Sequence, residues 1–101
     1  MADANITEIV KKYIDILLTE KYKIINAYLF GSYAKGNFNE DSDIDVALVF
    51  DKLKDRFDTR VELMKLGRRI DLRIEPHPFS KKDLKDSDPF LSEVLRTGIK
   101  I

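Results

Sequence analysis

The chain has 101 residues, of which 44% are hydrophobic and 36% are charged, and it contains no cysteine. The length predicts a single domain over residues 1–101, and the composition is typical of a soluble globular protein. The absence of cysteine argues against a disulfide framework or a cysteine-based zinc site. The 18 basic and 18 acidic residues leave no net charge, so strong nucleic-acid binding is not expected. No apolar leader opens the chain and no apolar run approaches the ~18 residues that span a membrane, so we expect a cytoplasmic protein without a membrane partner.

The first part of the chain predicts a helix, a strand and a loop. Apolar residues repeat at helical spacing between residues 6 and 22, on a stripe made by Ile6, Ile9, Val10, Tyr13 and Leu17. The short apolar run Ile24–Phe30 predicts a strand that ends at a glycine. Glycine and asparagine residues between positions 31 and 41 then predict a loop without regular structure.

The second part of the chain predicts a helix and a strand. The helix is expected to end near Gly67, with an apolar face made by Phe57, Val61 and Met64. Residues 69–75 alternate strictly and predict a strand, with the inward positions taken by Ile70, Leu72 and Ile74. Pro76 and Pro78 are expected to break this strand.

The last residues predict a short helical turn capped by Ser80 and a final helix that begins at Pro89 and ends at Gly98. Together with a strand over residues 43–50, the order is helix, strand, loop, strand, helix, strand and two helices. The expected fold class is therefore α/β (an α+β sandwich), a small mixed sheet of three strands flanked by helices mainly on one side.

Two aspartates stand out in the strand over residues 43–50. Asp43 and Asp45 alternate with an opposite face that is entirely apolar, made by Ile44, Val46, Leu48 and Phe50. Carboxylates at positions i and i+2 lie on one face with Cα atoms ~6.6 Å apart, and can converge on magnesium, which takes one or two carboxylates plus water and phosphate oxygens. A frayed strand start with Asp45 facing solvent would give the same pattern. An EF-hand calcium loop is excluded, because Val46 and Lys52 stand where it needs glycine and glutamate.

The segment "GSYAKG" (residues 31–36) follows the first strand. Gly31 and Ser32 can free backbone N–H groups and a hydroxyl for a polyphosphate, although a plain turn would look the same. If the two strands are neighbours, this turn and the aspartate pair meet at one edge of the sheet. Asp71, alone on the polar side of the third predicted strand, would supply a third carboxylate, unless it is a surface residue. Three carboxylates can hold two metal ions about 3.5–4 Å apart for in-line displacement at phosphorus.

The pattern "GSYAKG…SDIDV" resembles the signature of the DNA polymerase β-type nucleotidyltransferase superfamily. It is especially similar to the minimal nucleotidyltransferase (MNT) proteins, the antitoxins of toxin–antitoxin pairs whose toxins are HEPN-family ribonucleases. The resemblance covers essentially the whole chain, and Gly-Ser, ten residues and Asp-x-Asp is a specific motif. The residues that match the family pattern are Gly31, Ser32, Asp43, Asp45 and Asp71.

The resemblance implies an antitoxin that neutralises a HEPN-family toxin, encoded by an adjacent gene, by transferring AMP from ATP to a tyrosine hydroxyl of that toxin. The implied cofactor is Mg²⁺, as two ions. Gly31 and Ser32 would hold the nucleotide, Asp43 and Asp45 would bind the metal ions, and Asp71 would bind metal and take the proton of the acceptor hydroxyl.

Two alternatives stay open from the sequence: an antitoxin that masks its partner by binding alone, and a transferase that acts on a small molecule. His77, between two prolines, is more typical of a loop residue than of a catalyst. Tyr33 and Phe38 could stack on a base or fill the interior of their own loop. Several basic residues could neutralise a triphosphate or simply be surface charges: Lys35, Arg60, Arg68, Arg69 and Arg73.

Overall fold

A four-stranded mixed sheet forms the centre of the computed structural model, which describes residues 4–39 and 41–101. The strands, in the sheet order β3-β2-β1-β4, are β3 (Ile74–Ser80), β2 (Ile44–Phe50), β1 (Ile24–Phe30) and β4 (Ile99–Lys100). β1 is antiparallel to both of its neighbours, and β2 and β3 are parallel. The predicted mixed sheet is therefore confirmed, with β4 as an additional strand too short to be recognised in the sequence.

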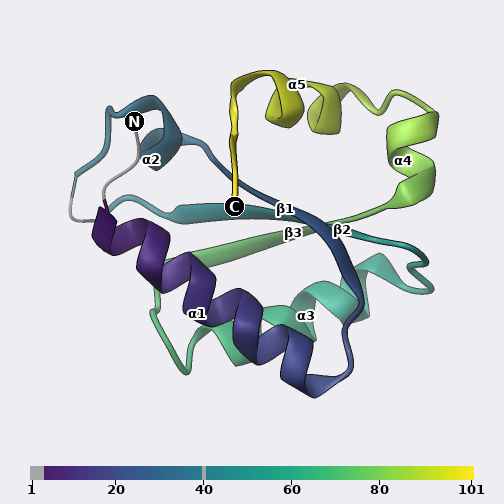
Figure 1. The fold of residues 1–101 in the computed structure, drawn as a ribbon, viewed down its shortest axis with the longest axis horizontal. Helices are drawn as coiled ribbons and strands as arrows, with labels where there is room; N and C mark the ends of the chain where they lie inside the picture. Colours follow the sequence, from purple (N-terminus) through teal and green to yellow (C-terminus); the bar gives the residue numbers. More distant parts are fainter. Residues whose placement is uncertain (1–3, 40) are drawn as a thin grey trace.

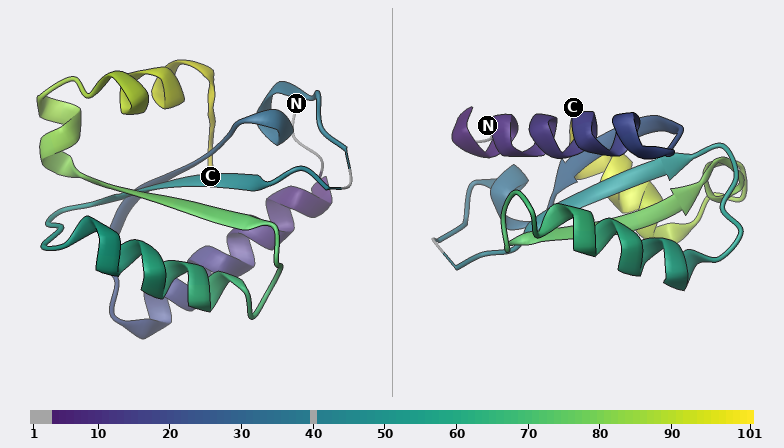
Figure 2. Two further views of the ribbon diagram at one scale, coloured as in Figure 1. Left: turned by 180° about the vertical axis from the view of Figure 1, so that it is seen from behind. Right: turned by 90° about the horizontal axis from the view of Figure 1, so that it is seen from below.

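Helices lie on both faces of this sheet (Figure 1). α1 (Ala4–Glu20) and α3 (Arg56–Gly67) lie side by side on one face, as the view from below in Figure 2 shows. α4 (Lys81–Lys85) and α5 (Pro89–Thr97) lie on the other face, and the single turn α2 (Ser32–Lys35) follows β1. Among the helices of the described residues, none is both long enough and apolar enough to cross a membrane.

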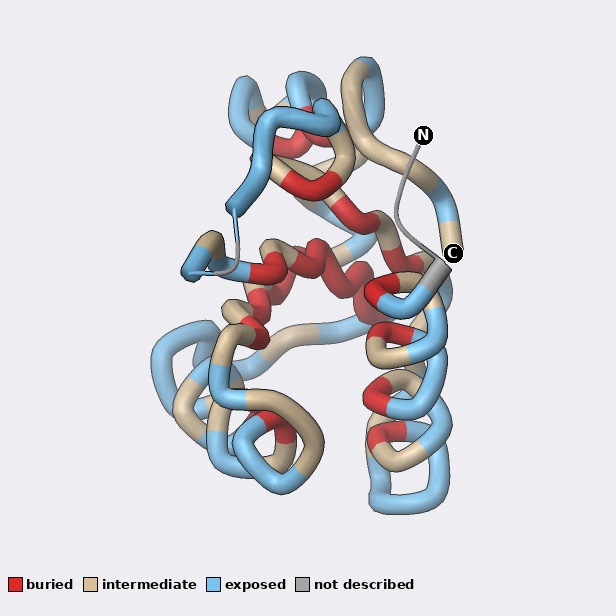
Figure 3. Tube along the Cα trace, turned by 90° about the vertical axis from the view of Figure 1, so that its left-hand side faces the viewer, coloured by how far each residue is buried: buried red, intermediate tan, exposed pale blue. Residues whose placement is uncertain are grey.

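The alternation predicted for β2 is confirmed by the packing of its two faces. Its even-numbered residues join α1 and α3 in the larger core, which includes Ile44, Val46, Leu48, Phe50, Val10, Tyr13, Leu17 and Leu63. Ala47 and Val49 face the opposite way and pack with Phe79, Leu91 and Val94 in a smaller core beneath α5. Figure 3 shows the buried positions along the sheet and on the inner side of α1, whose outer side is exposed.

The face that α3 turns inward differs from the prediction. Phe57 is 75% exposed, whereas Leu63 is fully buried, and Gly67 lies close to β3 and α1. The hydroxyl of Tyr13 donates a hydrogen bond of 2.7 Å to the Leu63 carbonyl oxygen and joins the two helices. Apolar residues occur on several sides of α3, so its periodicity does not select one face, and packing against α1 and β3 decides which residues are buried.

The third strand also differs from the prediction: it runs over Ile74–Ser80 and contains both prolines. The Ile44 N–H donates to the Arg73 carbonyl at 2.8 Å, so odd-numbered residues of β3 bond to β2 and Pro76 and Pro78 direct their backbone toward the free edge. Proline lacks only an N–H that an edge strand does not need there. Residues 69–73 form a turn instead, and Leu72, expected inside, is 73% exposed.

Candidate functional site

Gly31 lies where β1 ends, directly against the carboxylate of Asp45. The register of β1 and β2 pairs Phe30 with Asp45, so the residue after Phe30 turns away beside this side chain. Gly31 has φ = +74°, and a Cβ atom at this position would overlap Asp45 Oδ2. Both the backbone conformation and the neighbouring carboxylate therefore require glycine. The structure thus brings Gly31 and Asp45 together, as the motif predicts.

The turn after Gly31 is a single helical turn rather than an irregular loop. α2 begins at Ser32, and its first hydrogen bond runs from the Lys35 N–H to the Gly31 carbonyl oxygen at 3.1 Å. The N–H groups of Ser32, Tyr33 and Ala34 therefore have no acceptor within the helix. These donors and the Ser32 hydroxyl lie at the same end of the sheet as Asp45, which is an arrangement suited to an anionic group.

Asp43 immediately precedes β2 and is exposed, whereas Asp45 is the second residue of the strand and is 26% exposed. The i, i+2 spacing and the extended backbone put both residues at the sheet end where Gly31 lies. The predicted pair therefore occupies one place in the fold, with Asp45 closer to the glycine turn.

Two residues of β3 lie next to Asp45 that sequence reasoning did not assign to the site. Glu75 is the register partner of Asp45 in the parallel pair, so the two side chains lie on one face with Cα atoms about 4.8 Å apart. His77 Nε2 is 3.1 Å from Asp45 Oδ1. Arg60, from α3, reaches Glu75 with 3.5 Å between Nη2 and Oε2. The alternation of Ile74, Pro76 and Pro78 was the sequence signal that could have placed Glu75 and His77 on this face.

Asp71 lies outside this face, on the turn before β3. The Arg73 guanidinium donates to its carboxylate twice, from Nε at 3.0 Å and from Nη2 at 2.8 Å. These hydrogen bonds hold the pKa of the Asp71 carboxyl below its ordinary value, and the same pair raises the pKa of Arg73. Asp71 was expected on a strand beside Asp43 and Asp45; that placement is wrong, because the strand begins three residues later.

Arg73 connects Asp71 to the segment that follows the glycine turn. Its Nη1 donates to the Tyr33 hydroxyl oxygen at 2.8 Å, and the Tyr33 hydroxyl donates to the Asn39 carbonyl oxygen at 3.2 Å. Tyr33 is buried and its ring stacks on Phe38 with 4.4 Å between centroids. Tyr33 and Phe38 therefore fill the interior of their own loop, and Asp71 stabilises that loop through Arg73.

Comparison with known proteins assigns the family. A model of the family described as "Polymerase beta, Nucleotidyltransferase" matches residues 5–101. The chain belongs to the polymerase β nucleotidyltransferase family. This nucleotidyltransferase is also similar to a protein of Methanocaldococcus jannaschii named "Putative protein adenylyltransferase MJ1379", with 36% identity over 92 residues that cover 82% of this chain and 91% of the relative.

Solved structures of toxin–antitoxin proteins have a similar fold. A crystal structure described as a toxin–antitoxin with AMP-PNP has a TM-score of 0.68 at 29% identity, covering 89% of this chain and 69% of that chain. A mutant of the toxin–antitoxin MntA-HpeT has a TM-score of 0.66 at 29% identity, covering 91% of this chain and 70% of that chain. The nucleotidyltransferase-like fold and the resemblance to the antitoxin branch are thereby confirmed.

The carboxylates of this nucleotidyltransferase suit a metal ion that also binds phosphate, and not an all-protein metal cage. Within residues 4–39 and 41–101, no group of three or more Asp, Glu, His or Cys side chains is arranged to hold a metal ion. In this part of the chain Asp71 is not grouped with Asp43 and Asp45, and its carboxylate contacts Arg73; the metal ligands stay a prediction. Asp45 Oδ2 lies where a Cβ atom of Gly31 would stand, directly before the first residue of α2. Magnesium bound by one or two carboxylates and completed by phosphate oxygens fits this arrangement.

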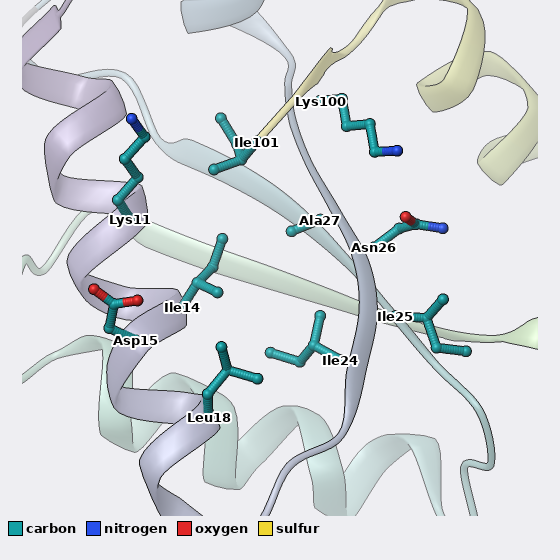
Figure 4. Close-up of a pocket in the computed structure, with 10 residues that line it drawn as sticks. All are labelled: Lys11, Ile14, Asp15, Leu18, Ile24, Ile25, Asn26, Ala27, Lys100 and Ile101. Carbon is teal, nitrogen blue, oxygen red and sulfur yellow. The ribbon is translucent and has the colours of Figure 1, made fainter.

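A separate pocket of about 460 Å³ lies between α1 and the first half of β1, whereas Gly31 follows the last residue of β1. In Figure 4, Ile14 and Leu18 of α1 face Ile24 and Ile101 across it. None of the predicted site residues lines this pocket. We therefore place the candidate site at the Gly31 end of the sheet.

Proposed function

We propose that this nucleotidyltransferase transfers AMP from ATP to a hydroxyl group of a partner protein, and that the partner is a HEPN-family toxin modified on a tyrosine. The observation that carries the proposal is the contact between Gly31 and the Asp45 carboxylate, which joins a phosphate-binding turn to a metal-binding acid. The name of the similar M. jannaschii protein supports protein adenylylation. The similar toxin–antitoxin structures, one with AMP-PNP, support ATP and a toxin partner.

In this proposal, residues of the glycine turn hold the triphosphate. The N–H groups of Ser32, Tyr33 and Ala34 and the Ser32 hydroxyl donate hydrogen bonds to the terminal phosphate oxygens. Asp43 and Asp45 would hold Mg²⁺, which when bound supplies positive charge against the oxygens of the triphosphate. Gly31 lets the phosphate chain approach the backbone, because no side chain stands between the turn and Asp45.

The transfer itself needs an acceptor oxygen, a leaving group and a place for one proton. The acceptor oxygen forms a bond to the α-phosphorus as the bond from that phosphorus to the bridging oxygen breaks, and pyrophosphate leaves. The hydroxyl proton passes to a carboxylate of the site. The sequence assigned this third carboxylate to Asp71; the register pairing with Asp45 and the ionic contact of Asp71 with Arg73 favour Glu75.

Mass spectrometry of the partner tests the proposal. The protein is incubated with ATP, Mg²⁺ and the product of the adjacent gene, and the partner is expected to gain the mass of one or more AMP groups. Asp45→Asn should abolish the gain, and Glu75→Gln should reduce it far more than Asp71→Asn. A partner that forms a complex but gains no mass would refute the transferase and favour masking by binding alone. A larger loss of AMP transfer in Asp71→Asn than in Glu75→Gln would assign the role of the third carboxylate to Asp71.

A further inference from the structure

A second pocket, of about 390 Å³, opens beside the catalytic carboxylates at the free edge of the sheet. We call it the β3 pocket; the residues that matter in its lining are Arg56, Phe57, Arg60, His77, Phe79 and Phe90. They come from the start of α3, from β3 and from α5. We propose that the β3 pocket holds the nucleoside of the nucleotide, with its base stacked on the exposed phenylalanine rings. This inference rests on the proposed function, because it requires a nucleotide at the Gly31 turn.

The pocket presents aromatic surface that the fold leaves uncovered. Phe57 is 75% exposed and Phe90 is 48% exposed, although both are large apolar side chains. The Phe90 ring is held edge-to-face against Phe30, His77 and Phe79, with centroids 5.6–5.7 Å away. Phe90 is therefore fixed in position with part of its surface open. Exposed, fixed aromatic rings are the platforms on which proteins stack bases, whatever the identity of the base.

The pocket adjoins the carboxylates, because two residues of its lining, His77 and Arg60, contact Asp45 and Glu75. Phe30, Asp45 and Glu75 are successive register partners across β1, β2 and β3, so two strand spacings of about 4.8 Å separate the first strand from the third. Phosphates at Gly31 stand at the β1 end of this row, and the pocket begins at its β3 end. His77 belongs to both, because it lines the pocket and its Nε2 lies 3.1 Å from Asp45 Oδ1.

Two arginines line the pocket, and each is paired with a carboxylate. Arg60 is 44% exposed and contacts Glu75 at 3.5 Å. Arg56 binds Asp83 at 2.6 Å, and its guanidinium lies 5.7 Å from the Phe79 ring centroid. The volume is within the range of about 300–1,000 Å³ of small-molecule pockets. Aromatic walls, two arginines and contact with the catalytic acids favour a nucleoside over a side chain of the partner protein.

Binding measurements on the full chain can separate the nucleoside from the phosphates. ATP and inorganic tripolyphosphate are each titrated by calorimetry in the presence of Mg²⁺, into the wild type, Phe57→Ala and Phe90→Ala. We expect both substitutions to weaken the binding of ATP at least about fivefold, since loss of one base stack has about that effect. The affinity for tripolyphosphate should be unchanged. Phe57→Tyr keeps the ring and should bind ATP as the wild type does. Leu72→Ala is the matched control, since Leu72 is 73% exposed and outside the pocket.

The outcomes distinguish the pocket from the proposed function. A wild type that binds ATP no more tightly than tripolyphosphate, or variants that bind ATP normally, would overturn the nucleoside site and leave the transferase standing. Variants that bind ATP normally but modify the partner poorly would assign the pocket to the partner protein and overturn the inference. A wild type that binds neither compound would overturn both proposals.

Discussion

Alanine at Gly31 is expected to disable the site, whereas alanine at Gly36 is expected to lower stability alone. Gly36, with φ of +82° and ψ of 6°, is in the left-handed region, where alanine introduces about 1–2 kcal/mol of backbone strain. Gly31, with φ of +74° and ψ of −151°, is in a region that essentially only glycine adopts, so alanine is more strained there. Alanine also reduces the conformational entropy of the unfolded chain, which offsets about 0.4–1 kcal/mol of this loss of stability. Gly36→Ala should therefore lose about 1 kcal/mol, which lowers the Tm by about 4–8 °C for a domain of this size, and Gly31→Ala should lose more.

The two positions differ in what the added methyl group contacts. At Gly36 no heavy atom lies within 4 Å, whereas at Gly31 the methyl would overlap Asp45 Oδ2. To reach an ordinary contact distance the carboxylate must withdraw by about 1 Å, and a displacement of that size at a reacting group costs about 100-fold in rate. Gly36→Ala should therefore retain transfer activity, and Gly31→Ala should lose about two orders of magnitude.

The pair is assayed by thermal unfolding, followed by circular dichroism, and by the rate of AMP transfer with saturating Mg²⁺ and ATP. The rates are compared at a temperature at which both variants are folded, and a large loss of rate in Gly31→Ala alone is the expected result. Equal losses of rate in the two variants would show that backbone strain, and not the position of Asp45, is responsible. An active Gly31→Ala would refute the role given to the contact.

Two further predictions concern the turn before β3. Asp71→Asn should lower the free energy of unfolding at pH 7 by about 1–2 kcal/mol, since it weakens charged hydrogen bonds from Arg73. The pKa of Asp71 is lowered in the folded chain from its ordinary 3.8, so the contribution of Asp71 to stability is present above pH 3.8 and is lost as the pH falls through the folded pKa. Urea unfolding at pH 7 and pH 3 should show that the difference in free energy of unfolding between wild type and Asp71→Asn shrinks at pH 3. An undiminished difference at pH 3 would contradict the assignment. Leu63→Ala, in the core, should lower the free energy of unfolding by about 2–5 kcal/mol, while Leu72→Ala should change it by less than about 0.5 kcal/mol. Similar losses of stability in the two variants would argue that residues 69–75 form the predicted strand.

Much of the site could be predicted because its parts are local in the sequence. The Gly-Ser turn comes directly after the end of β1, and the two aspartates lie at the start of β2. Antiparallel pairing of these two strands is therefore enough to bring the turn and the aspartates together. The alternation at the start of β2 was equally readable, because Asp43 and Asp45 alternate with Ile44 and Val46. These predictions required only periodicity and the assumption that sequential strands pair.

The errors concern residues whose positions depend on the order of strands. Proline breaks a central strand but not an edge strand, and the sequence does not say that β3 is at the edge. Placing the strand too early put Asp71 on the sheet and left Glu75 and His77 unassigned. The conformation of Tyr33, buried against Phe38 and held by Arg73, likewise depends on a contact across 40 positions of the chain.

The sequence by itself determined the family pattern, the glycine turn, the aspartate pair and the helices and strands that carry them, because each depends on residues close together in the chain. Only the tertiary structure decided which residues complete the site. The parallel register of β2 and β3 brings Glu75 and His77 to Asp45, while the Arg73 contact keeps Asp71 on its turn. The alternation of β3 puts Glu75 and His77 on one face, but which residues of β2 they pair with depends on how the two strands pack, and α3 separates these strands in the chain.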